Sequence, residues 1–296
     1  MPLLYVTDLA YPARGRRYGD EDTFLTSRLR EHFPLALCHP LDAASLMGGF
    51  DAVVVRNSGP VLHYQEAYDA FRTAALATGT RVYNPLVGRG DMAGKQYLLD
   101  LTAAGFPVIP TVDDPADLHL LPEVPVYAVK PKQGADSIGL TFTADPGGPA
   151  GEVLIQPRID FAYEVSFYYV DDAFQYALYA PDPARRWDLV PYAATDEDLA
   201  FASRFIAWNT LAHGIQRVDA CRAPSGELLL VELEDLNPYL SLDLLPEPTR
   251  DAFVTSLVAS LKSFLASDPP TRWPRPHGAL RTAVTGASRP DGKLEG

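Results

Sequence analysis

The first third of the chain alternates short apolar segments with longer amphipathic ones, and this alternation is the feature that most restricts the fold. Residues 3–7, 52–56 and 81–83 have the apolar, β-branched composition of buried strands. Residues 21–33 and 64–77 repeat their apolar side chains at helical spacing. Strands that alternate with helices in this way pair in parallel, so the sequence predicts a small parallel α/β lobe.

Ligands of parallel α/β sheets bind beyond the carboxyl ends of the strands. Arg56 ends one of the apolar segments and is therefore a candidate contact for an anionic substrate. Arg14, Arg16 and Arg17 follow the first strand, but solvated loop arginines are the simpler interpretation of these three.

Beyond residue 90 the pattern changes to short strands and a few helices. Helices are predicted over 92–104, 196–213 and 247–266. The predicted strands span residues 127–130, 140–143, 153–156, 164–170, 174–179, 216–221 and 228–234. The segment from residue 268 onward is rich in proline and glycine and lacks periodicity, so we expect its end to be disordered.

The charge and the apolar content exclude several function classes. A net charge of −13 at pH 7 over 296 residues disfavours nucleic acid and anionic membrane surfaces. No apolar run reaches the roughly 20 residues that a membrane helix needs, and the N-terminus lacks a signal-peptide pattern, so a cytoplasmic location is expected. Cys38 and Cys221 lie far apart without metal-ligand spacing, which disfavours a disulfide framework or a zinc site.

Lys130 ends a predicted strand, and a loop of small residues bracketed by Gly134 and Gly139 follows it. Such a loop lets backbone N–H groups close over phosphates while the lysine supplies positive charge. The loop joins two strands, whereas a dinucleotide-binding fingerprint opens a helix. The sequence around Lys95 lacks the Ser or Thr of a Walker A motif, because Gln96 occupies that position. The segment therefore predicts a phosphate-binding loop that is neither a dinucleotide-binding fingerprint nor a Walker A motif.

Acidic residues converge on the predicted hairpin formed by residues 216–221 and 228–234. Alternate side chains of a strand share a face, so Glu232 and Glu234 point the same way, and Asp219 on the neighbouring strand can join them. Three oxygen ligands suit Mg²⁺ held against phosphates better than zinc. A solvated acidic face explains the same pattern about equally well.

The order and spacing of these motifs resemble the ATP-grasp superfamily of carboxylate-amine ligases. The similarity is greatest to the branch that contains bacterial glutathione synthetase, the ribosomal-protein glutamate ligases and the cyclo-ligases of antibiotic pathways. It covers about residues 3–265. The motifs that carry it are, in chain order, Asn84-Pro85, Lys95, Lys130 with its glycine loop, residues 154–159, Arg217-Val218-Asp219 and Glu232-Leu233-Glu234.

This resemblance implies an ATP-grasp fold with three lobes. The N-terminal parallel α/β lobe would span residues 1–88. Two α+β lobes would enclose the nucleotide, the first over residues 89–160 with the glycine-rich loop and the second over residues 161–268 with the metal site. Residues 269–296 would form the partly disordered tail.

The resemblance also implies roles for individual residues. Arg217 would be the catalytic residue that neutralises developing charge, although an ion-pair partner of the carboxylates is the alternative. Arg56 and Arg186 are the candidate substrate contacts. ATP would be bound by Lys95, Lys130, Gln133, Gly134, Ser137, Gly139, the hinge residues Gln156, Pro157, Arg158 and Ile159, and Glu164. Mg²⁺ would be held by Asp219, Glu232, Glu234 and Asn237, the last because many relatives carry asparagine where Glu234 stands.

The activity implied by the resemblance is an ATP-dependent ligation of a carboxylate to an amine through an acyl phosphate, with an amino acid or peptide as substrate. An ATP-grasp small-molecule kinase and a non-catalytic ATP-binding protein are the alternatives, and the intact acidic cluster counts against the second. The expected cofactors are ATP and Mg²⁺. No nucleic acid or membrane partner is expected, and a homodimer is one candidate assembly. The sequence does not name the acid or the amine.

Overall fold

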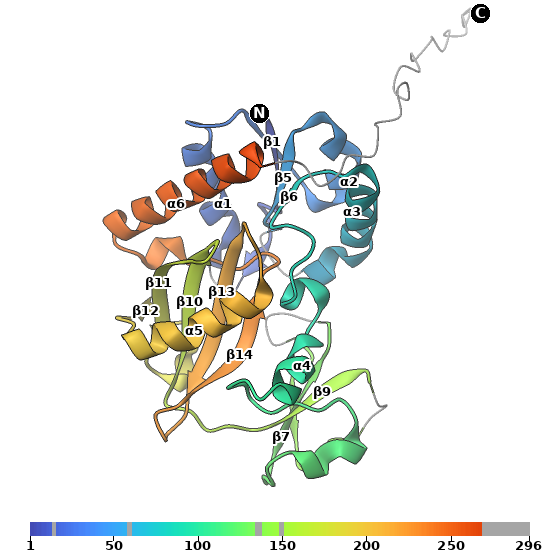
Figure 1. The fold of residues 1–296 in the computed structure, drawn as a ribbon, viewed down its shortest axis with the longest axis vertical. Helices are drawn as coiled ribbons and strands as arrows, with labels where there is room; N and C mark the ends of the chain where they lie inside the picture. Colours follow the sequence, from blue (N-terminus) through green and yellow to red (C-terminus); the bar gives the residue numbers. More distant parts are fainter. Residues whose placement is uncertain (14–15, 58–60, 134–137, 148–150, 268–296) are drawn as a thin grey trace, which may run out of the picture.

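The structure is a computed structural model that describes residues 1–13, 16–57, 61–133, 138–147 and 151–267. Its lobes follow one another along the chain, and the last helix returns to the first lobe (Figure 1). No helix in these ranges is long and apolar enough to cross a membrane.

The N-terminal lobe is built on a parallel sheet with strand order β4-β1-β5-β6. Its strands are β1 (Leu3–Val6), β4 (Leu35–Cys38), β5 (Ala52–Val55) and β6 (Val82–Tyr83). Every residue of β1 and β5 is buried, as expected for central parallel strands covered on both faces. The predicted parallel α/β lobe is therefore confirmed, and β4 is a strand that the sequence pattern did not indicate.

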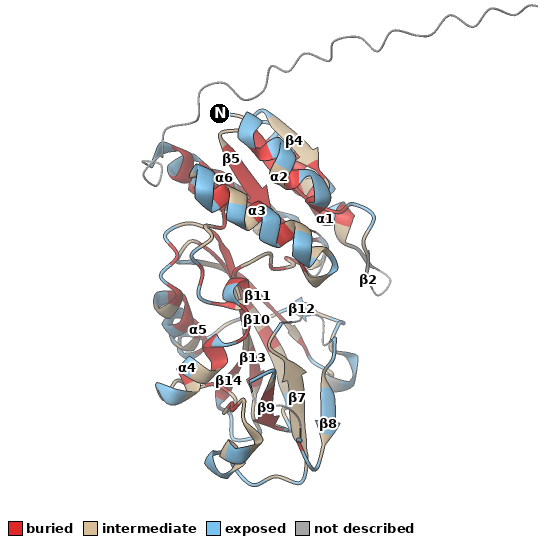
Figure 2. Cartoon of the chain, turned by 90° about the vertical axis from the view of Figure 1, so that its right-hand side faces the viewer, coloured by how far each residue is buried: buried red, intermediate tan, exposed pale blue. Residues whose placement is uncertain are grey.

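Helices cover both faces of this sheet (Figure 2). α2 (Ala43–Leu46) and α3 (Gln65–Thr78) pack on one face. α1 (Tyr18–Leu29) packs on the other face together with α6 (Glu247–Ala266). A short antiparallel pair, β2 (Pro12–Ala13) with β3 (Arg16–Arg17), precedes α1. α1 begins before the predicted residues 21–33 and ends at Leu29.

The middle of the chain forms a small antiparallel sheet with strand order β8-β7-β9. Its strands are β7 (Tyr127–Pro131), β8 (Thr141–Thr143) and β9 (Val153–Pro157), close to the predicted ranges. The helix predicted over 92–104 is interrupted: a 3₁₀ turn at Asp91–Ala93 is followed by α4 (Tyr97–Ala103). Between the two, Gly94 adopts a φ of 87°, which breaks the helical path.

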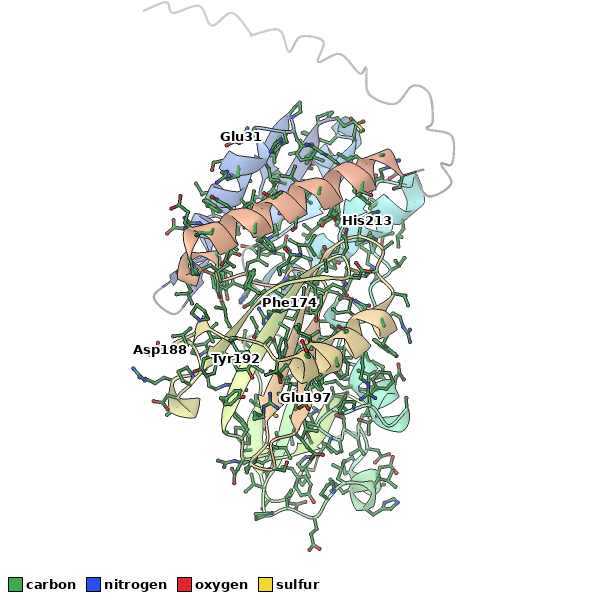
Figure 3. All side chains as sticks on the ribbon, turned by 60° about the vertical axis from the view of Figure 1, so that its left-hand side comes forward. Glu31, Phe174, Asp188, Tyr192, Glu197 and His213 are labelled. Carbon is green, nitrogen blue, oxygen red and sulfur yellow. The ribbon has the colours of Figure 1, made fainter. Side chains whose placement is uncertain are left out.

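A larger antiparallel sheet has strand order β12-β11-β10-β13-β14. Its strands are β10 (Tyr163–Val170), β11 (Ala173–Ala180), β12 (Val190–Pro191), β13 (Ile215–Arg222) and β14 (Leu228–Glu234). α4 and α5 (Asp196–Asn209) share a core with this sheet. Phe174 and Tyr192 pack against that core, and Figure 3 labels both together with Glu197 of α5.

The capping box before α5 is present, because Thr195 and Asp198 exchange hydrogen bonds across the first turn. The helix ends at Asn209 and not at the predicted His213. Thr210 then turns into the left-handed region with a φ of 60°. The earlier end leaves the Asn209 side chain available to the residues of β13 and of the turn after β14.

α6 joins two lobes into one core. Its buried residues Phe253, Leu257 and Leu261 belong to the same cluster as Leu3 and Tyr5 of β1. The cluster also contains residues of β10 and β11 from the larger sheet. The N-terminal lobe and the larger sheet are thus held together by one apolar helix.

Candidate functional site

A cavity of about 570 Å³ lies between the small sheet and the end of the larger sheet. Apolar side chains such as Ile138, Leu140 and Phe142 line one part of it, and Lys95 and Lys130 line another. The predicted hinge, Gln156 to Ile159, and Glu164 also line this cavity. Volumes of about 300–1,000 Å³ are typical of sites for small molecules and cofactors.

The two predicted phosphate-binding lysines come together in this cavity from different elements. Lys130 lies on β7, and Lys95 lies in the turn before α4. The Lys95 ammonium is 2.9 Å from a carboxylate oxygen of Glu232. Burial opposes the charge on Lys95, but Glu232 outweighs it, so the pKa of Lys95 is raised. Burial and the neighbouring Lys95 lower the pKa of Lys130 to about 8. Two cations that line one cavity and act on each other in this way favour the binding of an oxyanion there.

The predicted hairpin brings the acidic residues to one place. In the register of β13 and β14, Asp219 lies opposite Glu232 and Arg217 lies opposite Glu234. Asp219, Glu232 and Glu234 line a cavity of about 110 Å³ that shares Glu164, Arg186, Val231 and Glu232 with the larger one. The alternation deduced from the strand pattern is therefore confirmed for these positions.

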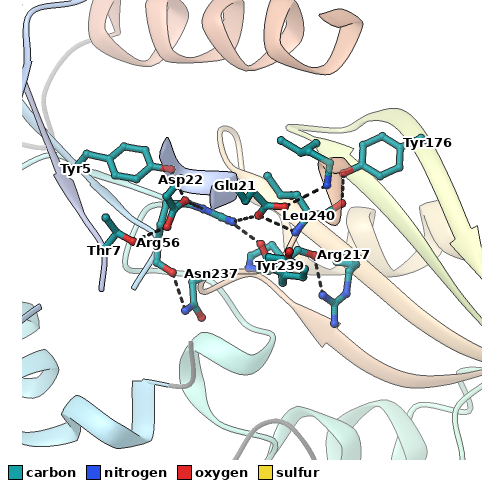
Figure 4. A network of polar contacts seen from close by, with 12 residues as sticks. Tyr5, Thr7, Glu21, Asp22, Arg56, Tyr176, Arg217, Asn237, Tyr239 and Leu240 are labelled. Atoms are coloured by element: carbon teal, nitrogen blue, oxygen red, sulfur yellow. Dashed lines mark hydrogen bonds and ion pairs between the residues drawn. The ribbon is translucent and has the colours of Figure 1, made fainter. Parts of the chain in front are cut away.

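Arg217 holds two of the three carboxylates. Its Nε and Nη2 donate to the two oxygens of Asp219, each at 2.8 Å, and Nη2 also donates to Glu234. Ser166 donates to Asp219 at 2.6 Å. The Arg217 fork is fixed by this bidentate geometry, and its third nitrogen donates to the Tyr239 carbonyl oxygen at 3.0 Å (Figure 4).

The acids differ in their electrostatic surroundings. Burial disfavours the charge on Glu232, but Lys95 and Lys130 outweigh it and hold its pKa below the ordinary value. Burial raises the pKa of Glu234 to about 8 against the opposing effect of Arg217. Within the described ranges, no three acidic, histidine or cysteine side chains form a ready metal-ligating group. The ion pairs explain this, because Lys95 pairs with Glu232 whereas Arg217 pairs with Asp219 and Glu234.

Asn237 lies apart from these carboxylates. Its side-chain nitrogen donates to the carbonyl oxygen of Arg56 at 3.0 Å, and it lines a smaller cavity toward the N-terminal lobe. The structure thus brings Glu234, and not Asn237, to the face shared by Asp219 and Glu232.

Arg56 does not reach the cavity. Its guanidinium donates to Glu21 at 2.8 Å, to Asp22 at 3.3 Å and to the Pro238 carbonyl oxygen at 2.7 Å, and its side chain is only 5% exposed (Figure 4). The expectation that Arg56 meets an anionic substrate is corrected accordingly. Glu21 and Asp22 of α1, which lies earlier in the chain, neutralise the positive charge of Arg56 at the end of β5.

Arg186 does line the cavity. It follows a 3₁₀ turn at Pro183–Arg185, and its Nε donates to Glu164 at 2.6 Å. Burial raises the pKa of Glu164, with Arg186 acting in the opposite direction. Both residues line the cavity, and Arg186 lies two residues before Asp188, which projects beside the larger sheet in Figure 3.

The hinge and the glycine loop are only partly described. The Gln156 side chain donates to Thr111 at 2.8 Å, and the backbone nitrogen of Arg158 donates to the Val126 carbonyl oxygen at 3.1 Å. Gly139 has a φ of 77°. Gly134 and Ser137 lie outside the described residues.

Several cavity residues were not among the predicted ones. Cys221 lies two residues beyond Asp219 on β13 and shares its face, so the same alternation could have identified it. Phe142 on β8 carried no comparable signal, because single exposed aromatic residues are common on protein surfaces that bind nothing.

No protein-family model matches the chain, and no curated protein sequence matches it. Solved structures are similar over most of the chain. D-cycloserine synthetase DcsG shares 22% identity at a TM-score of 0.69, covering 88% of this chain and 100% of its own. The ATP-grasp ligase PsnB, complexed with a variant of its minimal precursor, Mg and ADP, shares 17% identity at a TM-score of 0.56. This similarity covers 88% of the present chain and 98% of PsnB. The D-alanine–D-alanine ligase from Bacillus anthracis, complexed with ATP, shares 11% identity at a TM-score of 0.62. This similarity covers 90% of the present chain and 97% of the ligase. The chain therefore has the ATP-grasp fold.

Proposed function

We propose that this protein of ATP-grasp fold is an ATP-dependent ligase that joins a carboxylate to an amine. The observation that carries the proposal is the pair of adjoining cavities, one with Lys95 and Lys130 and the other with Asp219, Glu232 and Glu234. The two cavities share Glu232 and a side of the β13–β14 hairpin, so a ligand in one lies beside a ligand in the other.

The lining of the larger cavity fits ATP, and the neighbouring carboxylates have the chemistry that Mg²⁺ requires, although Lys95 and Arg217 hold them in the arrangement described above. The larger cavity has an apolar part, which suits a purine ring, and a part with two lysines, which suits the negatively charged phosphates. Carboxylate oxygens are the ligands that Mg²⁺ prefers, and Asp219, Glu232 and Glu234 would supply them. The similar ligases PsnB and that of Bacillus anthracis are described with Mg and ADP and with ATP, which supports this assignment.

When bound, ATP would supply the phosphoryl group that activates a carboxylate, and Mg²⁺ would neutralise phosphate charge. The protein's own residues would position the phosphates and stabilise the developing negative charge. Lys95 and Lys130 would hold phosphate oxygens from two sides. Arg217 presents a planar fork beside these carboxylates, and it would stabilise developing negative charge by exchanging contacts with Asp219 and Glu234 for contacts with the phosphoryl group. Glu164 would contact ATP, and Arg186 would border the substrate.

The test is release of ADP over pairs of amino acids and dipeptides, followed by mass analysis of the product. A ligase needs both an acid and an amine before it releases phosphate and ADP. A small-molecule kinase needs one acceptor and leaves a stable phosphorylated product, so that outcome would overturn the proposal. Nucleotide binding without turnover on any pair would indicate the non-catalytic alternative. Consumption of ATP fits a cytoplasmic location, and sedimentation would test the homodimer.

A further inference from the structure

Two aspartates, Asp91 and Asp235, join the turn before α4 to the end of β14. The buried Asp235 carboxylate accepts hydrogen bonds from the backbone nitrogens of Gly90 at 2.8 Å and Met92 at 2.9 Å. In the opposite direction, one carboxylate oxygen of Asp91 accepts hydrogen bonds from the backbone nitrogens of Asp235 at 2.7 Å and Leu236 at 2.9 Å. Each segment therefore supplies a carboxylate that binds the backbone of the other.

Two glycines let the backbone pass this close to the end of β14. A Cβ on Gly88 would lie 2.3 Å from a carboxylate oxygen of Asp235. A Cβ on Gly90 would lie 2.6 Å from the carbonyl oxygen of Leu233. Both distances are far shorter than a van der Waals contact, so a side chain at either position would push the two segments apart.

A further contact lies on the other side of Lys95. The backbone nitrogen of Leu233 in β14 donates a hydrogen bond to the hydroxyl oxygen of Tyr97 at 2.7 Å, and Tyr97 is buried. Lys95 follows Asp91 by four residues and precedes Tyr97 by two. The lysine is thus attached to one strand on both of its sides, and α4 lies beside β14 in Figures 1 and 2.

These contacts explain where the Lys95 ammonium lies. The backbone nitrogen of Gly94 donates to the carbonyl oxygen of Asp91 at 2.9 Å, which continues the turn up to the lysine. The ammonium then lies 2.9 Å from Glu232 of the same strand and lines the larger cavity. A lysine side chain is long and flexible, so a fixed backbone is needed to keep its ammonium at one place in the cavity.

We propose that Asp91, Tyr97 and Asp235 are positioning residues that set the place of Lys95 relative to the acids of β14. None of the three is among the described residues that line the larger cavity, so they would act on a bound nucleotide through Lys95. The inference rests on the proposed function, because a nucleotide phosphate is the partner that Lys95 has there. The phosphate-binding lysine and the carboxylates proposed for Mg²⁺ then form one unit, although they come from distant parts of the chain.

The experiment is a double-mutant cycle on nucleotide binding. Calorimetry measures the affinity for Mg²⁺ with the non-hydrolysable imido analogue of ATP in the wild type, Asp235→Asn, Lys95→Met and the double variant. Asp235→Asn places an amide NH₂ group against backbone N–H donors, so we expect it to weaken binding about tenfold. In the Lys95→Met background it should weaken binding no further, because a residue that acts only through Lys95 has no effect once the ammonium is gone.

Asp91 provides a matched pair of variants. Asp91→Asn keeps an oxygen that can accept both backbone hydrogen bonds, so its affinity should equal that of the wild type. Asp91→Ala removes the acceptor and should weaken binding as Asp235→Asn does. This rescue by the amide at one position, and not at the other, follows from the donors that each carboxylate faces.

Tyr97→Phe tests the same inference if Asp235→Asn does not fold. It removes one hydrogen bond to β14 and should weaken binding about two- to tenfold. Tyr83→Phe is its control, because it removes a buried hydroxyl that bonds to Ser260 at 2.8 Å and does not line the larger cavity. The control should keep the affinity of the wild type.

Additive losses in the cycle would overturn the inference, since a residue that only stabilises the fold does not act through Lys95. So would wild-type affinity in Asp235→Asn, equal losses in Asp91→Asn and Asp91→Ala, or equal losses in Tyr97→Phe and Tyr83→Phe. If the wild type bound no nucleotide, the proposed function would fail and the inference with it. Binding without turnover would overturn the ligase activity alone, because the cycle measures binding.

Discussion

Affinity for Mg-nucleotide should fall as the pH rises through the pKa of Lys130. Burial and Lys95 lower that pKa to about 8 in the free protein. A bound polyphosphate favours the charged form and raises the pKa again. The charged fraction of free Lys130 falls from about 90% at pH 7 to about 10% at pH 9. If binding requires the charge, the affinity falls about tenfold over this range, which corresponds to about 1.4 kcal/mol.

The direction in which the affinity changes with pH follows from proton linkage. Because the bound state has the higher pKa, nucleotide binding takes up a proton, and the uptake approaches about 0.9 per site at pH 9 but only about 0.1 at pH 7. Phosphate groups, with a second pKa of about 6, stay ionised throughout this range and do not produce the effect. Isothermal titration calorimetry in buffers of different ionisation enthalpy measures both the affinity and the protons taken up.

Three variants isolate the contribution of this side chain. Lys130→Met should bind weakly and lose the fall in affinity between about pH 7 and 9, since that titrating group is gone. Glu234 also has a pKa of about 8, but its ionisation adds negative charge for Mg²⁺ and therefore acts in the opposite direction. Lys130→Arg should remain charged, bind more tightly than Lys130→Met and likewise show no fall in affinity. Lys132→Met changes a lysine that lies two residues further along the chain and is paired with Asp113, and it should keep the wild-type slope. A fall in affinity with rising pH that survives in Lys130→Met, or an absence of proton uptake at pH 9 in the wild type, would refute the reasoning.

Three other variants test the remaining assignments. Arg217→Lys should lower turnover by about 10²-fold or more with little change in nucleotide affinity or melting temperature, because lysine cannot reproduce the planar fork; parallel loss of stability and activity would point to an ion-pair role. Glu232→Gln keeps the shape of the side chain, so it should raise the Mg²⁺ concentration needed for turnover while leaving the fold intact, as a metal titration of activity would show. Arg56→Met leaves Glu21 and Asp22 buried without their cation and should destabilise the protein by about 3–5 kcal/mol in chemical unfolding, whereas an Arg56 that served only a substrate would alter KM and not stability.

The parts of the site that depend on local pattern could be predicted from the sequence. Strand alternation and a short hairpin are sufficient to bring Asp219, Glu232 and Arg217 to one face, because both follow from the period of a β-strand. Lys130 at the end of a strand is a local feature of the same kind. These positions were confirmed, whereas their roles in ATP and metal binding stay predictions.

The features that could not be predicted depend on contacts between distant segments. Arg56 is neutralised by two acids of α1, and nothing in the apolar run that it ends indicates them. α5 ends at Asn209 because that side chain bonds to Gln216 and to Asp235 on the segments beside it. Asp235 also accepts hydrogen bonds from the backbone nitrogens of Gly90 and Met92, which holds the turn where the sequence indicated a continuous helix. In each case a tertiary hydrogen bond overrides local propensity.

The position of α6 has a consequence for how the protein is made. The face of the first sheet that carries Leu3 and Tyr5 packs against this helix, which ends at Ala266. A nascent chain leaves the ribosome from its N-terminus, so the part of this apolar face that α1 does not cover stays exposed until α6 has been synthesised. We expect a chain that stops at Pro246 to be digested by proteases in its N-terminal lobe, although every strand of that sheet is present. The N-terminal lobe thus depends for its stability on a helix that is translated about 160 residues after its own last strand.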